Sequence, residues 1–388
     1  MHLPSDRIRS SATAQGGGTD DQPTHHPTHL TKDPMTFELS SLGWDEHFQS
    51  AYVRHARPDQ QPARVTRVDR GVCTLLASDG THRASLGGHV LAAAAHDPTR
   101  LPCAGDWAVL RTWPDERLTI EAVLPRRTAV VRASAGAEAL GQILVANVDT
   151  IATVVPVDPE PDLGLIERLL SLAWESGARP VVALTKVDLA AHPEVLVGEV
   201  SEIAPDVEVF GVSAVTGAGL DQLCALARIG RTLGLLGASG AGKSTIVNAL
   251  AGATVMPTRP IRRADGRGRH TTTHRALIPL PGGGAVIDIP GIRSAGLFAG
   301  TAGLEHTFAD IVGLAERCRF DDCTHGHEPG CAVLAALAAG ELTPRRMEHW
   351  RKLQREIERE SRRHDVRISA PERRRLIRGH ARPYPRTS

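Results

Sequence analysis

A phosphate-binding loop is the sequence feature with the clearest chemical meaning. Residues 237–244 read Gly-Ala-Ser-Gly-Ala-Gly-Lys-Ser and fit the pattern G-x-x-x-x-G-K-[ST] between a predicted strand and a predicted helix. In such a loop, backbone N–H groups close around phosphates, the lysine supplies a positive charge and the final hydroxyl binds Mg²⁺. The predicted nucleotide-binding residues here are Gly237, Ala238, Ser239, Gly240, Ala241, Gly242, Lys243 and Ser244, with Ser244 also a magnesium ligand.

Two upstream segments predict that the base is guanine. Thr185-Lys186-Val187-Asp188 follows an apolar strand and is similar to the Asn/Thr-Lys-x-Asp signature of guanine-binding proteins. The Asp188 carboxylate can accept from both N1–H and the exocyclic amine of guanine, which adenine cannot offer. Ser213 and Ala214, at the end of the next predicted strand, fit the companion loop that contacts the guanine carbonyl. All these segments lie at the carboxyl ends of strands, where open α/β sheets bind ligands.

The segments after the phosphate loop have the features of two nucleotide-sensing switches. Asp288-Ile289-Pro290-Gly291 ends an apolar strand, so Asp288 can hold Mg²⁺ through water and the Gly291 N–H can reach the γ-phosphate. Residues 268–273, Gly-Arg-His-Thr-Thr-Thr, have the position and hydroxyl groups of a first switch. One of these threonines is expected to complete the magnesium shell, and Thr272 is the candidate.

The residue that orients the attacking water is not the usual glutamine. Ile292 follows Gly291, and an aliphatic side chain cannot hold a water. His270 is therefore the candidate catalytic residue, against the alternative that it is an exposed loop histidine.

A cysteine and histidine cluster predicts a structural metal site. Cys318-x4-Cys323-x-His325-x5-Cys331 supplies three thiols and an imidazole, enough for a closed tetrahedral Zn²⁺ site. His327 is an alternative fourth ligand. Three other cysteines have apolar sequence neighbours and are predicted to be core thiols: Cys73, Cys103 and Cys224.

The elements that must position these residues alternate between strands and helices. Continuous apolar runs predict strands covered on both faces, and the helical spacing between them indicates a parallel α/β sheet. The predicted strands are Thr150–Val157, Arg179–Leu184, Val207–Val212, Thr232–Leu236, Ala276–Leu280 and Ala285–Ile289, and the helices are Leu163–Ser176, Gly219–Ile229 and Lys243–Ala251.

A β-rich region precedes this sheet. Five short strands separated by turn signals suggest a small barrel. The oligonucleotide-binding type is one candidate, and any other small β-domain is the alternative. These strands are predicted at Arg64–Val68, Val72–Ala77, His82–Val90, Trp107–Thr112 and Leu118–Leu124.

The order of the motifs is a circular permutation. Ordinary GTPases begin with the phosphate loop and end with the base-reading segments, whereas here the base-reading segments come first. Because domain termini commonly lie close together, this rearrangement can preserve the sheet. It also places the switches directly before the metal module, so nucleotide state could be passed to that module.

Composition predicts a soluble, multidomain protein with local rather than global charge. The chain has 388 residues, 41% hydrophobic and 23% charged, and a formal net charge of +1. No apolar run of membrane-spanning length and no secretion signal is found, so a cytoplasmic location is expected. Residues 345–388 carry fifteen Arg or Lys against six Asp or Glu, which makes the C-terminal end basic.

Together, the permuted motifs, the β-rich region and the Cys-x4-Cys-x-His-x5-Cys cluster resemble one family, the small ribosomal subunit biogenesis GTPases called RsgA or YjeQ. The resemblance covers about residues 42–353. It implies that Thr185–Asp188 and Gly237–Thr245 bind GTP, so Thr245 joins the predicted nucleotide-binding residues. It also implies that the cluster binds zinc and that His270 is catalytic. Thr185 in place of the commoner Asn, the N-terminal extension and the Arg-rich tail depart from the family pattern.

Composition and the resemblance together predict four parts. The first is a disordered extension (1–40), because its first 34 residues have almost no aliphatic periodicity. The resemblance implies the next three, which are an oligonucleotide-binding (OB) type barrel that binds RNA (41–128), a circularly permuted GTPase domain (129–300) and a mainly helical zinc-binding domain (301–388), to which the charge count adds a basic C-terminal helix or tail. The expected function is a monomeric GTPase that binds the small ribosomal subunit and its RNA and assists late maturation, with GTP hydrolysis stimulated by the particle. A nucleotide-gated RNA-binding module with vestigial hydrolysis, or a metabolic P-loop kinase, are the alternatives.

Overall fold

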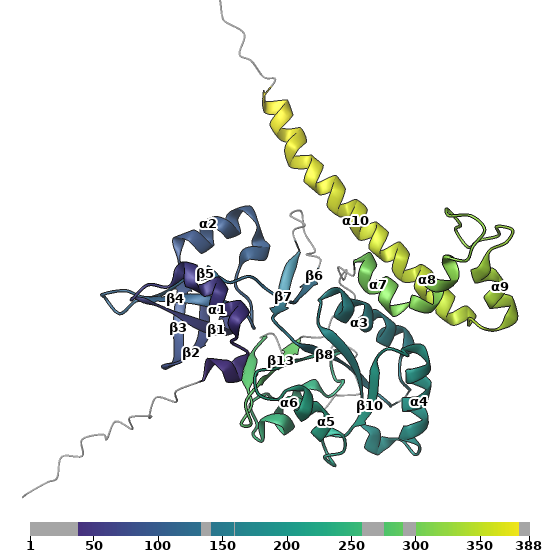
Figure 1. Ribbon diagram of the computed structural model, residues 1–388, viewed down its shortest axis with the longest axis horizontal. Coiled ribbons are helices and arrows are strands. Elements are labelled where there is room, and N and C mark those ends of the chain that lie inside the picture. Colours follow the sequence, from purple (N-terminus) through teal and green to yellow (C-terminus); the bar gives the residue numbers. More distant parts are fainter. Residues whose placement is uncertain (1–37, 133–140, 159, 258–274, 290–299, 380–388) are drawn as a thin grey trace, which may run out of the picture. The chain divides into compact units, whose positions relative to one another are not determined.

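The computed structural model describes residues 38–132, 141–158, 160–257, 275–289 and 300–379 (Figure 1). Within the described ranges, every helix is too short or too polar to traverse a lipid bilayer.

A closed five-stranded barrel forms the first part of the described chain. Its strand order is β1-β2-β3-β5-β4, with β1 paired to β4 and with β3 and β5 running parallel through the pair Ser85 and Thr119. This closed order is the OB type, which decides between the two alternatives for the β-rich region. The strands are β1 (Gln60–Asp69), β2 (Val72–Ala77), β3 (Gly80–Leu86), β4 (Trp107–Thr112) and β5 (Leu118–Val123).

Local sequence signals explain much of the barrel. Asp69 pairs with Val72 across the two-residue turn Arg70-Gly71, whose φ angles of 44° and 85° are those of the hairpin turn that suits the twist of paired strands. The Asp45 carboxylate accepts from the N–H groups of His47 and Phe48 and so begins helix α1 (Glu46–Tyr52). One prediction is wrong in part, because the expected strand His82–Val90 ends at Leu86 and an alanine-rich helix, α2 (Gly88–His96), follows.

A six-stranded sheet follows the barrel, in the order β10-β9-β8-β11-β13-β12. All neighbours run parallel except β12, which pairs antiparallel with β13 at the edge. The strands are β8 (Thr150–Pro156), β9 (Arg179–Thr185), β10 (Glu208–Val212), β11 (Thr232–Gly237), β12 (Leu277–Pro279) and β13 (Ala285–Ile289). A separate pair, β6 (Ala129–Arg132) and β7 (Gln142–Ala146), precedes this sheet.

Two hydrophobic cores cover the two faces of this sheet. Ile151 and Val155 of β8 pack with α3 (Leu163–Glu175) and α4 (Pro193–Ile203) in one core. Ala152 and Val154 of the same strand pack with α5 (Leu220–Leu226) and α6 (Lys243–Ala251) in the other. Alternate residues of one strand therefore enter different cores, as the continuous apolar runs predicted.

The C-terminal part is helical, as predicted. Its helices are α7 (Thr301–Thr307), α8 (Ala309–Ala315), α9 (Ala332–Ala339) and α10 (Pro344–Gly379). Phe308, Met347 and Trp350 belong to its own core, together with Cys331 of the metal cluster.

A buried ion cluster attaches α10 to helix α3. Glu167 of α3 is fully buried and contacts Arg345, Arg346 and His349 of α10, at 2.6–3.2 Å. Arg346 also donates to both carboxylate oxygens of Asp310 at 2.7 Å. Hydrogen bonds from His349 and Arg345 lower the pKa of Glu167, although burial alone would raise it.

A second buried charge connects the barrel to the six-stranded sheet. Arg64 of β1, 1% exposed, donates to the carbonyls of Leu42 and Asn147 and, at 3.2 Å, to the Thr232 hydroxyl at the start of β11. Its guanidinium also lies 5.1 Å from the Trp107 ring centroid. Of the three predicted core thiols, Cys73 and Cys103 are buried, but Cys224 is exposed on α5, so that prediction was wrong.

Candidate nucleotide and metal sites

The phosphate loop lies between β11 and α6, where the sequence placed it. A side chain at Gly237 would bring its Cβ 2.2 Å from the Val154 carbonyl oxygen, so only glycine fits beside β8. The Lys243 ammonium is nearly buried and donates to the carbonyls of Gly237 and Ala238, at 2.8 and 2.9 Å. The loop backbone itself therefore holds the lysine that the sequence predicts to bind phosphates.

Asp288 and Ser244 form a magnesium-type pair beside this loop. The Ser244 hydroxyl donates to Asp288 Oδ2 at 3.2 Å, and Asp288 Oδ1 is buried with no hydrogen-bond partner. Burial raises the pKa of Asp288 and lowers that of Lys243, because each charge lacks water. An orphaned carboxylate oxygen next to a hydroxyl fits a hard divalent cation such as Mg²⁺.

The base-reading segments meet at the same edge of the sheet. Thr185 pairs with Val212 in the register of β9 and β10, which brings Ser213 beside the Thr-Lys-x-Asp segment. The buried Thr185 hydroxyl donates to the Ala241 carbonyl at 2.6 Å and so connects the base-reading segment to the phosphate loop. Lys186 has a φ of 61°, a left-handed conformation, and Asp188 is exposed in the short helix η4 (Val187–Leu189).

The companion loop is a compact turn built around one hydroxyl. Ser213 is buried, and its Oγ accepts from the N–H groups of Val215 and Thr216 at 3.3 and 3.2 Å. Ala214 is half-buried beside it. His270, Thr272, Gly291 and Ile292 lie outside the described residues.

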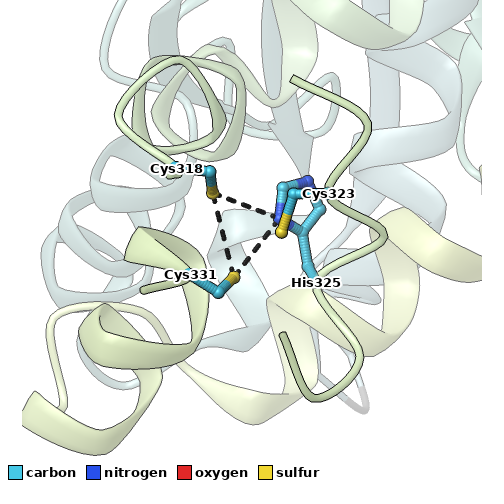
Figure 2. A group of neighbouring side chains, drawn as sticks. All are labelled: Cys318, Cys323, His325 and Cys331. Atoms are coloured by element: carbon cyan, nitrogen blue, oxygen red, sulfur yellow. Dashed lines mark hydrogen bonds between the residues drawn. The ribbon is translucent and has the colours of Figure 1, made fainter. Parts of the chain in front are cut away.

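The predicted metal ligands come together in the C-terminal part (Figure 2). One ligand atom from each of Cys318, Cys323, His325 and Cys331 lies within 4.8 Å of all the others. The Cys318 and Cys331 sulfurs are 3.8 Å apart, and His325 Nδ1 lies 3.5 Å from Cys318 Sγ and 3.4 Å from Cys331 Sγ. Tetrahedral ligands at ordinary zinc distances have S···S and S···N separations of about 3.8 and about 3.5 Å.

The surroundings of the quartet favour a bound cation. Burial raises the pKa of Cys318, but backbone N–H groups of Ala332 and Val333 at the start of α9 lower it overall. Burial and the neighbouring thiols raise the pKa of Cys323 to about 11, because crowded thiols resist ionising together. A cation removes that conflict. His327 is exposed and is not in the quartet, so the structure favours His325 as the fourth ligand.

A carboxylate holds the loop that carries His325. Glu328 accepts from the N–H groups of Thr324, Gly326 and His327 at 2.8–3.1 Å, and the Thr324 hydroxyl also donates to it. These hydrogen bonds lower the pKa of Glu328 far below its ordinary range. His325 itself has a φ of 54°, so the loop turns sharply at the metal ligand.

The fold and the arrangement of motifs define the class of protein. An OB-type barrel precedes a mainly parallel sheet whose predicted base-reading, phosphate-binding and magnesium-binding residues share one edge but occur in permuted order. The class is a circularly permuted P-loop GTPase, an enzyme that hydrolyses GTP.

Comparisons with known proteins identify the family. The model of the RsgA GTPase family matches residues 123–298. A Streptomyces coelicolor protein named small ribosomal subunit biogenesis GTPase RsgA is 49% identical over 335 residues, which cover 86% of this chain and 90% of that protein. A Methanosarcina acetivorans protein of the same name is 38% identical over 326 residues, 84% of this chain and 86% of that protein. The chain belongs to the RsgA family of GTPases.

Solved structures agree on the fold. YjeQ from Thermotoga maritima superposes with a TM-score of 0.56 at 24% identity, covering 77% of this chain and 98% of that one. YloQ, described as a circularly permuted GTPase, gives 0.55 at 22% identity over 78% and 97% of the two chains.

Sequence reasoning missed Glu167 and Arg64. Both are buried charged residues, and the signal for Glu167 was its place beside Ile166 and Leu170 on the buried face of a predicted helix. Their partners are distant in sequence, so only the folded chain shows them.

Proposed function

We propose that this GTPase binds the small ribosomal subunit and assists its late maturation, hydrolysing GTP with stimulation by the particle. The observation that carries the proposal is the near full-length similarity to relatives named for small ribosomal subunit biogenesis. Ribosomal RNA would be contacted by the barrel and by the basic C-terminal region, with the protein acting as a cytoplasmic monomer. The four-part division at residues 40, 128 and 300 is part of the proposal.

The residues that bind GTP are those assembled at the carboxyl edge of the sheet. Asp188 reads the guanine edge, Lys243 and the loop N–H groups bind phosphates, and Ser213 supports the loop that contacts the base carbonyl. Thr185 joins the two halves of this site through its bond to Ala241. The full proposed set is Thr185, Lys186, Val187, Asp188, Ser213, Ala214, Gly237, Ala238, Ser239, Gly240, Ala241, Gly242, Lys243, Ser244, Thr245, Asp288 and Gly291.

Magnesium bound with GTP would be held by Ser244 and Thr272, with Asp288 contacting it through water, and would neutralise phosphate charge. Lys243 must exchange its two loop carbonyls for phosphate oxygens when nucleotide enters. The proposed role of His270 is to orient the attacking water, because Ile292 has no polar group for it.

The metal of the quartet is proposed to be zinc. Three thiols and one imidazole at tetrahedral separations suit Zn²⁺, and four protein ligands leave no open position for substrate. The metal would therefore have a structural role, fixing the loop between α8 and α9.

Adding purified small subunits to the enzyme tests the proposal. GTP hydrolysis should accelerate with small subunits but not with large subunits, and cosedimentation with small subunits should be stronger with a nonhydrolysable GTP analogue than with GDP. Hydrolysis that is the same with and without small subunits would refute the assembly role.

The alternative of vestigial hydrolysis is favoured only by Ile292. Single-turnover hydrolysis by the wild type and by His270→Ala separates the two. A slower variant supports the catalytic role, whereas equal rates would remove it.

A further inference from the structure

One carboxylate organises the turn that carries the metal ligand His325. Glu328 Oε1 accepts from the N–H of Thr324 at 3.1 Å and also from the Thr324 hydroxyl. Its Oε2 accepts from the N–H groups of Gly326 and His327, at 2.8 and 3.0 Å. Both carboxylate oxygens are therefore occupied by donors from the residues on either side of His325.

The backbone conformation of this turn needs such support. His325 has a φ of 54°, in the left-handed region that residues with a Cβ rarely adopt. Successive N–H groups around a left-handed residue can form a small anion-binding hollow, and here Glu328 supplies the anion from the same loop. The carboxylate therefore favours a turn that the side chain of His325 disfavours.

Residues of α10 hold the other side of His325. Arg351 donates to the His325 carbonyl, and the Trp350 ring centroid lies 5.7 Å from that of the imidazole. His325 Nδ1 lies 3.5 Å from Cys318 Sγ and 3.4 Å from Cys331 Sγ, as Figure 2 shows. The place of this nitrogen in the quartet thus depends on the turn as well as on packing.

Glu328 contributes no ligand atom to the quartet. Among the described residues, the ligand atoms that lie within 4.8 Å of one another belong to Cys318, Cys323, His325 and Cys331. The oxygens of Glu328 are engaged by the loop instead. Any effect of Glu328 on the metal must therefore act through the turn.

We infer that Glu328 is a positioning residue that raises the metal affinity of the quartet by stabilising the left-handed turn at His325. Metal binding has to order the loop, and a turn favoured by the Glu328 hydrogen bonds leaves less ordering for the metal to bring about. Groups that orient a metal ligand from outside commonly change affinity by about 10-fold to 100-fold. The inference rests on the proposed metal site, and its test separates the two.

The zinc affinity of the full chain, measured by competition with a chelator of known affinity, tests the inference. Glu328→Gln keeps the size of the side chain but replaces one accepting oxygen with an NH2 group that faces N–H donors. Its zinc dissociation constant should rise about tenfold. The matched control Glu348→Gln removes the same charge from an exposed position on α10 and should leave the constant within about twofold.

Repeating the substitution in a His325→Ala background separates positioning from general stabilisation of the region. If Glu328 acts through His325, Glu328→Gln should change zinc affinity by less than about twofold once the imidazole is absent. A loss of about tenfold in both backgrounds would show general stabilisation and would overturn the inference.

Thr324→Ala is a milder variant that decides the matter if His325→Ala binds no zinc. It removes one donor to Glu328 and should weaken zinc binding about threefold. Wild-type affinity in Thr324→Ala would then overturn the inference, as would wild-type affinity in Glu328→Gln. Failure of the wild-type chain to bind zinc would reject the proposed metal site itself, whereas zinc binding that Glu328→Gln leaves unchanged rejects only the role of Glu328.

Discussion

The predicted nucleotide site, at the carboxyl edge of the sheet, and the metal quartet differ in what positions their residues. The nucleotide residues follow β9, β10 and β11 or lie in β13, and strand register and two hydrophobic cores fix their positions. The quartet spans residues 318–331, between α8 and α9, where the chain forms turns and bends. We therefore expect the sheet to hold its site before any ligand binds and the loop to depend on a bound ion for its stability.

Removing a metal ligand should have the largest effect. Cys331→Ser should lose the metal and unfold the region around residues 316–343, because structural zinc contributes about 10–16 kcal/mol of apparent binding energy to folding. Metal content and hydrogen exchange measure this, with the exposed Cys224→Ser as control. Full metal occupancy in Cys331→Ser would contradict the proposed ligand set.

The Glu167 cluster attaches α10 to α3 and belongs to neither of the two sites. Glu167→Gln leaves Arg345 and Arg346 without their buried counter-charge, so the free energy of unfolding should fall by about 3 kcal/mol. Chemical denaturation measures this change. Glu199→Gln, an exposed carboxylate on α4, should have little effect.

The same cluster predicts a pH dependence. The folded-state pKa of Glu167 lies below its ordinary value of 4.5, so its stabilisation is present above that pH and is lost as pH falls through the folded pKa. Unfolding free energy should therefore fall below pH 4.5 in the wild type and less steeply in Glu167→Gln. Identical slopes would show that Glu167 is not the responsible group.

Asp188 tests the base-reading half of the nucleotide edge. Asp188→Asn should weaken GTP binding by about 2 kcal/mol, about thirtyfold, because charged hydrogen bonds to the guanine N–H groups are lost. ATP affinity should change little. Competition titration with both nucleotides measures the preference, with exposed Asp206→Asn as control. An unchanged preference would favour the P-loop kinase alternative.

Thr185 should have the smallest effect. Thr185→Ala removes the hydroxyl that donates to Ala241, so GTP affinity should fall by about 1 kcal/mol, about fivefold, and Thr185→Ser should retain most of it. Equal affinity in Thr185→Ala and wild type would show that the bond does not connect the two halves of the site.

The sequence predicted the parts whose signals are local. The runs for β2, β4, β13 and α6 matched the observed bounds, because hydrophobic periodicity and the phosphate-loop context determine them. The metal quartet followed from the spacing of four residues. Helix α2 was not predicted. The strand-like residues of β3 lead through Gly87 and Gly88 into the helix, so its first residues were assigned to the expected strand His82–Val90.

The remaining features depend on distant partners. Arg64 contacts residues 22, 83 and 168 positions away, and Glu167 pairs with arginines 178 and 179 positions away. Neither periodicity nor motif spacing encodes such pairings. Thr185, which departs from the family pattern, likewise bonds to Ala241, 56 positions away. This hydrogen bond links two loops and could not be predicted from the sequence.

The most direct test of the contrast between the two sites is the affinity of metal-free protein for guanine nucleotide. Cys318→Ser/Cys331→Ser protein, supplied with Mg²⁺, is titrated with fluorescent GDP beside the wild type. The sheet-built site predicts affinities that agree within about twofold. A loss of tenfold or more would show that the nucleotide edge depends on the metal module and would contradict the account.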